Sequence, residues 1–535
     1  MTPDLPLRSV FASLWRSPLV FGALALFLLR AFFLPFTNLF PEEAYYWNYG
    51  QHLALGYLDH PPMVAWLIRL GGAVFGHGEV GVRVFALVCS FITTVFTVRL
   101  ADLLYGRRAA MMALLLVQGL PFFFLSGWVM TPDAPLTTCW AGMLYFLARV
   151  FFAGSARAWW GVGVCLGLGM LSKYTVALLG PATLLFLALD PASRPWFRRV
   201  LPYAAVALAV LIFSPVIVWN ATHHWASFAF QTTGRVQEPR HFSVQELLGA
   251  IAVLLTPLGI YLVGGPLFTR GGSLPVPAGD EDAERRRRLF ARVFTLVPLA
   301  VFVVFSLTHR VKLNWTGPLW LAVLPLAAAR LTAAFETPAT GSARWVRWSA
   351  LGTAAVLGGS YLVLWQYLAS GLPGIGYARS TELLPVGWPQ MARDLDQRAA
   401  ELRRTQPDRV LVVGLDRDFI ASEAAFYAAD PARAVHETTG AHLFGGVSLM
   451  YAYWFPVKEQ EGATLLLVSF DPKDLDSVRA RQHCRPLGTV ETTWIQVNGK
   501  RVRPYYTQVG FHFRDERYPK LPVVPQGRDG SPSRP

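Results

Sequence analysis

Charged residues are scarce in this sequence. Of its 535 residues only 15% are Asp, Glu, Lys or Arg, whereas 53% are hydrophobic and 13% are aromatic. A typical soluble domain carries about 25% charged residues. The composition therefore excludes an ordinary soluble protein of this size and indicates a membrane protein with several spans.

Cysteine is also rare, with four residues in the whole chain. Cys89, Cys139 and Cys165 lie in long apolar runs, which leaves Cys484 alone in the C-terminal part. This distribution suggests neither a disulfide framework nor a cysteine zinc site. The glycine fingerprint of nucleotide-binding proteins is missing too, because VVGLD (412–416) lacks its spacing.

Long apolar runs recur from the N-terminus to about residue 369 and predict about eleven transmembrane helices. The predicted spans are 18–36, 81–104, 109–129, 134–153, 158–172, 174–190, 200–218, 246–268, 289–307, 316–335 and 347–369. The runs at 158–172 and 174–190 are short for a hydrocarbon core of about 30 Å, which is typical of a broken or re-entrant segment. The first run is long and lacks a small-residue cleavage site, so we expect an uncleaved span.

Arginines in the short loops predict the orientation. They fall on alternate connections, which places them all in the cytoplasm if the number of spans is odd. They are Arg8 and Arg16, Arg107 and Arg108, Arg157, Arg194 with Arg198 and Arg199, Arg285 to Arg288, and Arg344 with Arg347. These loops explain most of the net charge of +14, so it is not interpreted as a nucleic-acid footprint.

The C-terminal part has a different composition, with frequent charges and short apolar runs. RVLVVGLD (409–416) predicts a buried strand, DFIASEAAFYAA (418–429) a helix, and ATLLLVSF (463–470) another strand. We therefore predict two domains, a membrane domain at 1–369 and an extracytoplasmic α/β domain at 370–535. We expect the second domain to cover the active site or recognise the acceptor, and its end, GRDGSPSRP (527–535), to be disordered.

The predicted outer loops carry most of the reactive side chains. They are EEAYYW (42–47), LDHPP (58–62), TPDAP (131–135), SKYT (172–175), WNATHHW (219–225) and THRVKLNWTGP (308–318). The opposite loops carry plain arginine. This asymmetry predicts an active site at the outer membrane interface.

Each of these residues also has a structural explanation. Acids such as Glu42 and Glu43 are favoured where a helix begins, and the aromatics beside them are typical of the membrane interface. Asp133 would cap the following helix, and Lys173 would extend to the surface. Arg30, deep in the first span, is harder to explain because a charge there needs a partner.

The motifs taken in order resemble a known family. FPEEAYYWNYGQHLALGYLDHPPMVAWLIRLGG (40–72), GEVGVRVFA (78–86), WVMTPDAPL (128–136), GLGMLSKYTVALL (167–179) and HRVKLNWTGP (309–318) are similar to those of the bacterial membrane glycosyltransferases of family 39. That family is related to protein O-mannosyltransferases and lipid A aminoarabinose transferases. The resemblance covers about residues 18–335. It implies the GT-C fold, a catalytic acid in the first outer loop and a polyprenyl-phosphate sugar as donor.

The resemblance implies roles for individual residues. Glu42 matches the leading acid, Glu43 lies beside it, and Asp59 matches a second acid before a Pro-Pro pair. Relatives commonly have Asp-Glu where this chain has Glu-Glu, so the general base remains open. The candidates for the donor phosphate are Lys173, Arg310, Lys312 and His60. The other candidates carried by these motifs and loops are Arg30, Arg83, Asp133, His223, His224 and Asn314.

Some relatives bind a divalent metal near the site. Asp59, His60, His223 and His224 could supply ligands, but zinc spacing is absent, so the metal remains open. The predicted function is transfer of a sugar to lipid A, another glycan or a protein outside the bacterial inner membrane. The alternatives are a transporter or flippase of a lipid-linked substrate, or a polymerase or ligase of lipid-linked glycans.

Overall fold

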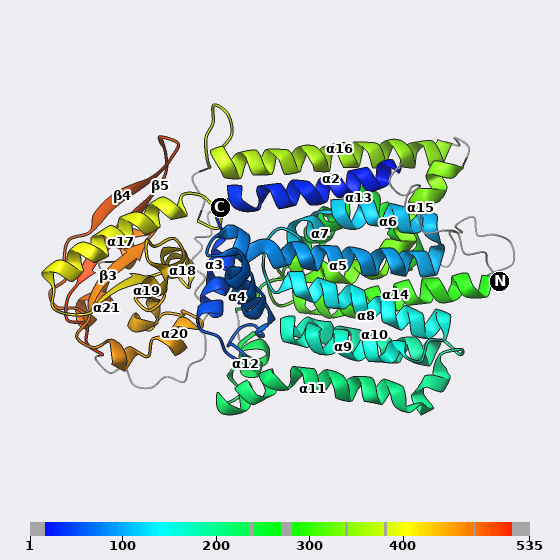
Figure 1. The fold of residues 1–535 in the computed structure, drawn as a ribbon, viewed down its shortest axis with the longest axis horizontal. Helices are drawn as coiled ribbons and strands as arrows, with labels where there is room; N and C mark the ends of the chain where they lie inside the picture. The colour runs from blue at the N-terminus through cyan, green and yellow to red at the C-terminus, as the bar shows by residue number, and fades with distance from the viewer. Residues whose placement is uncertain are drawn as a thin grey trace. The chain divides into compact units, whose positions relative to one another are not determined.

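A computed structural model describes residues 17–235, 239–268, 281–337, 341–378, 382–475 and 477–515. Within these ranges the chain is mostly helical and has one five-stranded sheet near the C-terminus (Figure 1). Seven of the described helices are long and apolar enough to cross a membrane, or eight spans if one bent pair is included. A multi-span membrane protein is confirmed, whereas the count of eleven is not. Arg8, Arg16 and 527–535 lie outside the described residues.

Long apolar runs form helices in lipid because a helix satisfies its backbone hydrogen bonds internally. The membrane-length helices are α2 Pro18–Phe33, α5 Glu79–Tyr105, α8 Asp133–Ala153, α11 Val200–Thr222, α13 Val244–Phe268, α14 Glu281–Ser306 and α16 Gly341–Ser370. Shorter helices lie between them: α3 Pro41–Gln51, α4 Met63–Phe75, α6 Arg107–Gly119, α7 Pro121–Ser126, α9 Ala158–Ser172, α10 Leu179–Leu189, α12 Ala226–Ala229 and α15 Leu324–Glu336.

Several predicted spans are interrupted in the structure. The run 109–129 divides into α6 and α7 because Leu120, before Pro121, is extended. The run 316–335 is bent by 66° between Leu313–Ala322 and Leu324–Glu336. Continuous apolar composition thus did not distinguish a straight span from two shorter helices.

The C-terminal part contains the predicted α/β fold. Its sheet has the order β2-β1-β3-β5-β4. Strands β2, β1 and β3 are parallel to one another, β5 is antiparallel to β3, and β4 is antiparallel to β5. The strands are β1 Val410–Gly414, β2 Thr438–Gly440, β3 Thr464–Ser469, β4 Glu491–Val497 and β5 Lys500–Gly510. The helices are α17 Trp388–Thr405, α18 Phe419–Phe426, α19 Pro431–Ala434, α20 Tyr451–Trp454 and α21 Val478–His483. The predicted strands around 409–416 and 463–470, and the helix between them, are therefore present.

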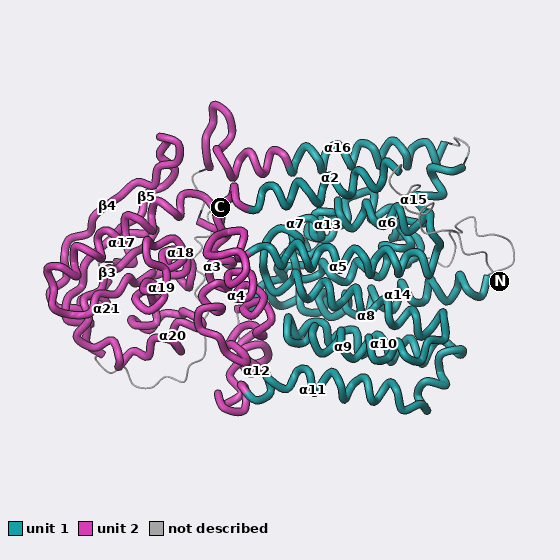
Figure 2. The backbone as a smooth tube through the Cα atoms, in the orientation of Figure 1, with its two compact units in different colours: residues 1–34, 83–218, 240–361 teal, residues 35–82, 219–239, 362–535 magenta. Residues whose placement is uncertain are grey.

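The chain separates into two compact units, coloured differently in Figure 2. Unit 1 comprises residues 1–34, 83–218 and 240–361, and unit 2 comprises 35–82, 219–239 and 362–535. Unit 2 thus contains both the first predicted outer loop and the C-terminal α/β fold. The domain boundary predicted at 369 follows chain order alone and stays a prediction.

Candidate active site

The first predicted acids lie in the opening turn of α3. Glu43 is fully buried, and its Oε2 accepts a hydrogen bond from the backbone N–H of Phe40 at 3.0 Å. This bond caps the helix, because N–H groups at a helix start have no partner within the helix. Glu42 is exposed. Glu43 therefore has a structural task, and Glu42 is the more accessible acid.

Asp59 lies in the loop after α3 and is held by that helix. Its Oδ1 accepts hydrogen bonds from the hydroxyl of Tyr45, at 3.1 Å, and from the hydroxyl of Tyr49. Its backbone oxygen accepts a further bond from Gln231 Nε2 at 2.5 Å. Tyr45 and Tyr49 are one helical turn apart, so α3 presents both hydroxyls on one face. Three bonds thus fix the carboxylate and the backbone of this acid.

Burial sets the proton affinity of Asp59. With only 5% of its surface exposed, desolvation raises the pKa of Asp59, and the bond from Tyr49 and the positive charge of Arg417 oppose this increase. His60 lies beside it, with Nε2 4.0 Å from Asp59 Oδ2. The histidine ring meets that of Tyr46 edge to face, with centroids 5.5 Å apart. The structure therefore places the His60 ring beside Asp59, and its role in binding the donor phosphate stays a prediction.

A third acid comes from the C-terminal α/β fold. Asp418, in the loop between β1 and α18, is 4% exposed. Burial raises its pKa well above the ordinary value, Arg417 opposes this, and the charges of Asp416, Asp59 and Glu42 add to it. Asp418 thus belongs to the same electrostatic cluster as the first-loop acids.

Sequence reasoning missed Arg417 and Asp418. The available signal was a run of three charged residues, DRD (416–418), directly after a buried strand. Ligands of α/β folds commonly bind where parallel strands end. The loop lacks the glycine fingerprint of a nucleotide site, so its sequence alone did not indicate a ligand.

Packing between α3 and α18 brings the loop to the acids. Asn48 Nδ2 donates to the backbone oxygen of Ser422 at 3.4 Å, and the rings of Trp47 and Phe426 meet edge to face at 5.2 Å. The hydroxyl of Tyr45 also accepts a bond from the backbone N–H of Met450 at 3.2 Å. Much of the aromatic cluster in EEAYYW is therefore buried within unit 2, instead of forming only a belt at the membrane interface.

A second polar group lies within unit 1. Lys173 Nζ donates to Asp133 Oδ1 at 2.9 Å, and Asn314 Nδ2 donates to Asp133 Oδ2 at 2.6 Å. Lys173 follows the end of α9 in an extended conformation, which turns the chain away from the helix. Asp133 begins α8. Three residues predicted separately from different motifs are thus brought together.

The other predicted phosphate ligands of unit 1 are more exposed. Arg310 Nε donates to Glu246 Oε2 at 3.3 Å, and His241 Nε2 lies 2.9 Å from Glu246 Oε1. Lys312 is exposed. Their role in binding phosphate stays a prediction.

The two neighbouring histidines have aromatic surroundings. The ring of His223 stacks on Trp219 with centroids 4.1 Å apart, and Tyr453 lies 6.3 Å from it. His224 is exposed and has a positive φ of 53°. Within the described ranges, no three His, Cys, Asp or Glu side chains are grouped as metal ligands would be. Asp59, His60, His223 and His224 therefore do not form such a group in the described part of the chain.

Two arginines are fully buried in unit 1. Arg30 donates to Ser90 Oγ at 3.1 Å and to Gln118 Oε1, so its charge is held by neutral acceptors. Arg83 donates to the backbone oxygen of Leu34 at 3.2 Å. Both arginines link separate helical segments, which is a structural contribution.

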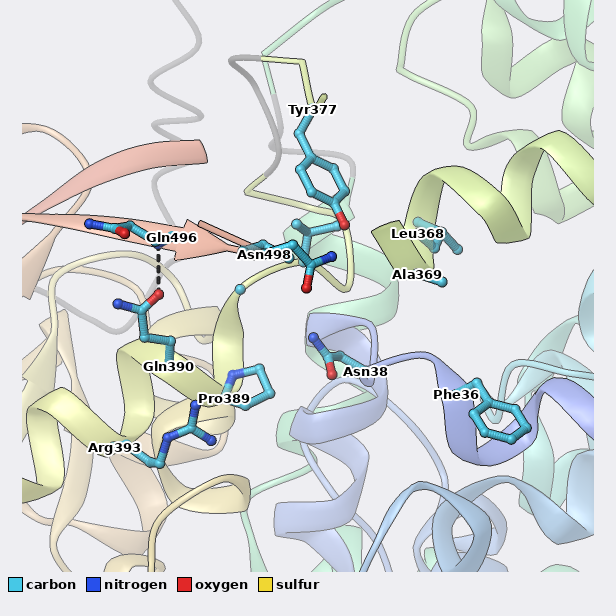
Figure 3. A pocket seen from close by; sticks show the side chains of 13 residues that line it. Phe36, Asn38, Leu368, Ala369, Tyr377, Pro389, Gln390, Arg393, Gln496 and Asn498 are labelled. Carbon is cyan, nitrogen blue, oxygen red and sulfur yellow. Dashed lines mark hydrogen bonds between the residues drawn. The ribbon is translucent and has the colours of Figure 1, made fainter. Parts of the chain in front are cut away.

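Unit 2 also contains a cavity of about 240 Å³. Asn38, Tyr377 and Asn498 come from three distant segments and point toward one another there (Figure 3). On another side of the cavity, the backbone N–H of Gln496 donates to Gln390 Oε1 at 2.6 Å. The lining residues include none of the predicted catalytic acids.

Part of this sequence is similar to known proteins. Residues 59–219 match the family described as dolichyl-phosphate-mannose-protein mannosyltransferase. The lipid A galacturonosyltransferase RgtD of Rhizobium johnstonii is 28% identical over 35% of this chain and 39% of its own length. The undecaprenyl phosphate-alpha-4-amino-4-deoxy-L-arabinose arabinosyl transferase of Pseudomonas aeruginosa is 28% identical over 48% of this chain and 47% of its own length. The match thus spans less than half of either relative.

The fold has a solved counterpart over nearly its whole length. The crystal structure of ArnT from Cupriavidus metallidurans superposes with a TM-score of 0.64, covering 93% of this chain and 98% of that one at 16% identity. A second structure of that protein is bound to undecaprenyl phosphate and has a TM-score of 0.60 at 16% identity, over 92% of this chain and 98% of that one. The resemblance predicted from the ordered motifs is thereby confirmed: the chain has the GT-C fold, and its residues 59–219 are similar to the dolichyl-phosphate-mannose-protein mannosyltransferases.

Proposed function

We propose that this protein transfers a sugar from a polyprenyl-phosphate donor to an acceptor of the lipid A type. The observation that carries the proposal is a GT-C scaffold that has the exposed Glu42 in the first turn of α3 and the buried Asp59 in the loop after that helix. ArnT, which has a related fold, binds undecaprenyl phosphate. The two curated relatives are named as a galacturonosyltransferase and an arabinosyl transferase. These relationships favour transfer over the transport of a lipid-linked substrate.

The chemistry is a direct displacement at the anomeric carbon. Glu42 takes the proton of the acceptor hydroxyl, and the oxygen forms a bond to the sugar carbon as the bond from that carbon to the phosphate oxygen breaks. Polyprenyl phosphate leaves with the electron pair of the broken bond. Glu42 suits this task better than Glu43 because the carboxylate of Glu43 already caps α3. Asp59 is the alternative base.

The phosphate side of the site requires cations. Lys173 is the least exposed cation of unit 1 among the candidates, and its amine donates to Asp133, which also accepts a bond from Asn314. Arg310, Lys312 and His60 complete the proposed set. A cation near the leaving phosphate stabilises the charge that develops on it in the transition state.

We also propose that the protein lies in the bacterial inner membrane with this site facing the periplasm. The proposal is supported by the arginine loops, which alternate with the loops that carry the acids. The acceptor would therefore be modified after it has crossed the membrane.

Single-turnover transfer with purified variants tests the proposed base. Glu42→Gln keeps the shape of the side chain but removes its basicity, so transfer should fall by about 10²-fold or more while donor binding persists. Glu43→Gln should have a smaller effect because glutamine can still accept the bond from Phe40. Glu401→Gln, an exposed residue of α17, is the matched control.

Three other results would change the assignment. Near-normal transfer by Glu42→Gln beside an inactive Glu43→Gln would move the base by one residue. Normal transfer by both, with an inactive Asp59→Asn, would assign the base to Asp59. Wild-type protein that transfers no sugar from any polyprenyl-phosphate donor in a panel would refute the function.

A further inference from the structure

The cavity of unit 2 lies where two apolar segments of membrane length end. Phe36 is the last residue of the first candidate span, and Leu368 and Ala369 lie in the last turn of α16. These three residues give the cavity an apolar wall. A molecule bound there would lie where a membrane helix meets water, which is the level of the lipid headgroups.

The other wall of the cavity is polar and comes from the α/β fold (Figure 3). Gln390 and Arg393 are three residues apart and so lie on one face of α17. Gln390 Oε1 accepts a hydrogen bond from the backbone N–H of Gln496 in β4 at 2.6 Å, which orients the amide. Asn498 forms the turn between β4 and β5, where its positive φ of 52° favours asparagine. Side-chain amides therefore reach the cavity from a helix and from a hairpin.

A short turn after α16 presents the hydroxyl of Tyr377. The backbone N–H of Leu372 donates to the oxygen of Gly376 at 2.9 Å, and the N–H of Gly376 donates back at 2.8 Å. The ring of Tyr367, in α16, lies 5.4 Å from that of Tyr377, and its hydroxyl accepts a bond from the N–H of Ala378 at 3.0 Å. These contacts hold Tyr377 with its hydroxyl directed into the cavity (Figure 3).

The hydroxyl of Tyr377 is the polar group that the protein leaves unsatisfied. Its oxygen is buried and has no hydrogen-bond partner in the part of the chain that the structure describes. A buried hydroxyl without a partner is destabilising, because it has lost its bonds to water. A polar ligand in the cavity would complete this bond.

The lining favours a ligand that carries hydroxyl groups. Amide side chains offer both donors and acceptors, as a tyrosine hydroxyl does, and a sugar presents both kinds of group around its ring. Among the described lining residues only Arg393 is charged and none is acidic, which disfavours a metal ion or a basic ligand. The volume of about 240 Å³ is below the roughly 300–1,000 Å³ of pockets for drug-sized molecules. The cavity thus suits one sugar ring and not a long glycan.

The cavity is close to the first-loop acids along the chain. Asn38 lines it, and Glu42 follows four residues later. Even a fully extended segment would place their Cα atoms within about 14 Å of each other. The cavity can therefore position a substrate for Glu42 without containing a catalytic acid itself.

We propose that this cavity binds one sugar unit of a membrane-anchored substrate. Its amides and the Tyr377 hydroxyl bind the sugar hydroxyls, and its apolar wall contacts the part of the substrate that leads to the lipid. The proposal rests on the proposed transfer function, because a lipid-linked donor and a glycolipid acceptor both carry a sugar at the membrane surface. The two sources present the same chemistry to the cavity.

Equilibrium binding to the full-length purified protein tests the proposal. Tyr377→Phe removes only the hydroxyl, Asn498→Gly removes the amide and keeps a residue that tolerates positive φ, and Ala369→Phe fills the cavity from the exposed end of α16. The controls are Tyr506→Phe, in β5, and Ser370→Phe, beside Ala369, because neither residue lines the cavity. Melting temperatures report whether each variant is folded.

The ligands form two pairs that differ in their sugar. Lipid A is compared with phosphatidic acid, which has acyl chains and a phosphate but no sugar. Undecaprenyl-phosphate glucose is compared with undecaprenyl phosphate. The protein is kept in a detergent without a sugar headgroup, since a glycoside detergent would compete for the cavity.

We expect Tyr377→Phe and Asn498→Gly each to weaken a sugar-bearing ligand by about three- to tenfold, the scale of one neutral hydrogen bond. Ala369→Phe should weaken it further, because the new ring occupies the space of the sugar. Both controls, and the binding of the sugar-free lipids, should match the wild type. Loss confined to lipid A identifies the acceptor as the source of the sugar, and loss confined to undecaprenyl-phosphate glucose identifies the donor.

Other outcomes overturn the proposal. Wild-type affinity of all three folded variants for both sugar-bearing lipids refutes it and leaves the transfer function intact. Equal losses for the lipids with and without sugar also refute it, because these residues then act only on the structure. If the variants lose sugar-dependent binding but the wild type transfers no sugar, the sugar site is supported and the transfer function is refuted.

Discussion

Glu42, Glu43 and Asp59 lie close together in the sequence, yet their carboxylates have different surroundings. Glu43 is committed to the cap of α3, Asp59 accepts two tyrosine hydroxyls, and Glu42 is exposed. A general base must reach the acceptor and be ionised at the working pH. Accessibility therefore favours Glu42 as the general base. Burial raises the pKa of Asp59.

The raised pKa of Asp59 predicts a dependence of stability on pH. Because the folded state binds this proton more tightly than the unfolded chain, the stabilisation is complete below the ordinary value of 3.8 and is lost as pH rises through the raised pKa. Asp59→Asn has no such proton. We expect the wild type to lose melting temperature relative to Asp59→Asn as pH rises from the ordinary value of 3.8 through the raised pKa.

Thermal melts of the purified proteins over this pH range provide the measurement. Asp102→Asn, which changes an exposed acid of α5, is the control and should follow the wild type. A difference between Asp59→Asn and the wild type that does not vary with pH would contradict the prediction.

In unit 1, the polar group of Asp133, Lys173 and Asn314 connects three elements. Apolar packing alone would not specify how these elements are arranged. Asp133 begins α8, Lys173 follows α9, and Asn314 lies in the short helix Leu313–Thr316. The ion pair is largely buried, with side-chain exposures of 14% for Lys173 and 7% for Asp133. Removing one member of such a pair leaves the other charge without compensation.

Lys173→Met should therefore lower the free energy of unfolding by about 3 kcal/mol or more, a value typical of a broken buried pair. The double variant Asp133→Asn, Lys173→Met should recover part of this loss, because neither charge remains. If Lys173 also binds the donor phosphate, the double variant will still bind undecaprenyl phosphate weakly. Denaturation and lipid binding on the same samples separate the two roles, and normal binding by the double variant would reduce Lys173 to a structural residue.

The distribution of arginine among the loops makes a prediction about the complete protein. Arg285 to Arg288 lie in the second turn of α14, whereas the α/β fold follows α16, the last described helix of membrane length. Loops rich in arginine remain in the cytoplasm. Residue 288 and residue 400 should therefore lie on opposite sides of the membrane.

Truncation fusions measure this topology. A fluorescent protein joined after Arg288 should fluoresce in the cytoplasm, and alkaline phosphatase joined at residue 400 should be active outside it. Fusions after Arg108 and Arg199, which end other arginine-rich loops, should behave like the fusion at 288. If the fusions at 288 and 400 lie on the same side of the membrane, the predicted orientation is refuted.

The sequence by itself determined the features that depend on local pattern. Runs of apolar residues indicated the membrane helices, since only an internally hydrogen-bonded helix is stable in lipid at such a composition. The strands around Val410 and Thr464 followed from short apolar runs of β-branched and leucine residues. The order of the motifs along the chain was enough to indicate the GT-C fold and the first-loop acids.

Only the tertiary structure decided which residues share a site. The charges of Asp59 and Glu42 act on Asp418 although more than three hundred residues separate them from it, because α18 packs on α3. Likewise, Lys173 and Asn314 meet on Asp133 from separate motifs. Hydrophobic periodicity specifies which face of an element is buried but not which partner covers it, so these contacts depend on the packing of distant segments.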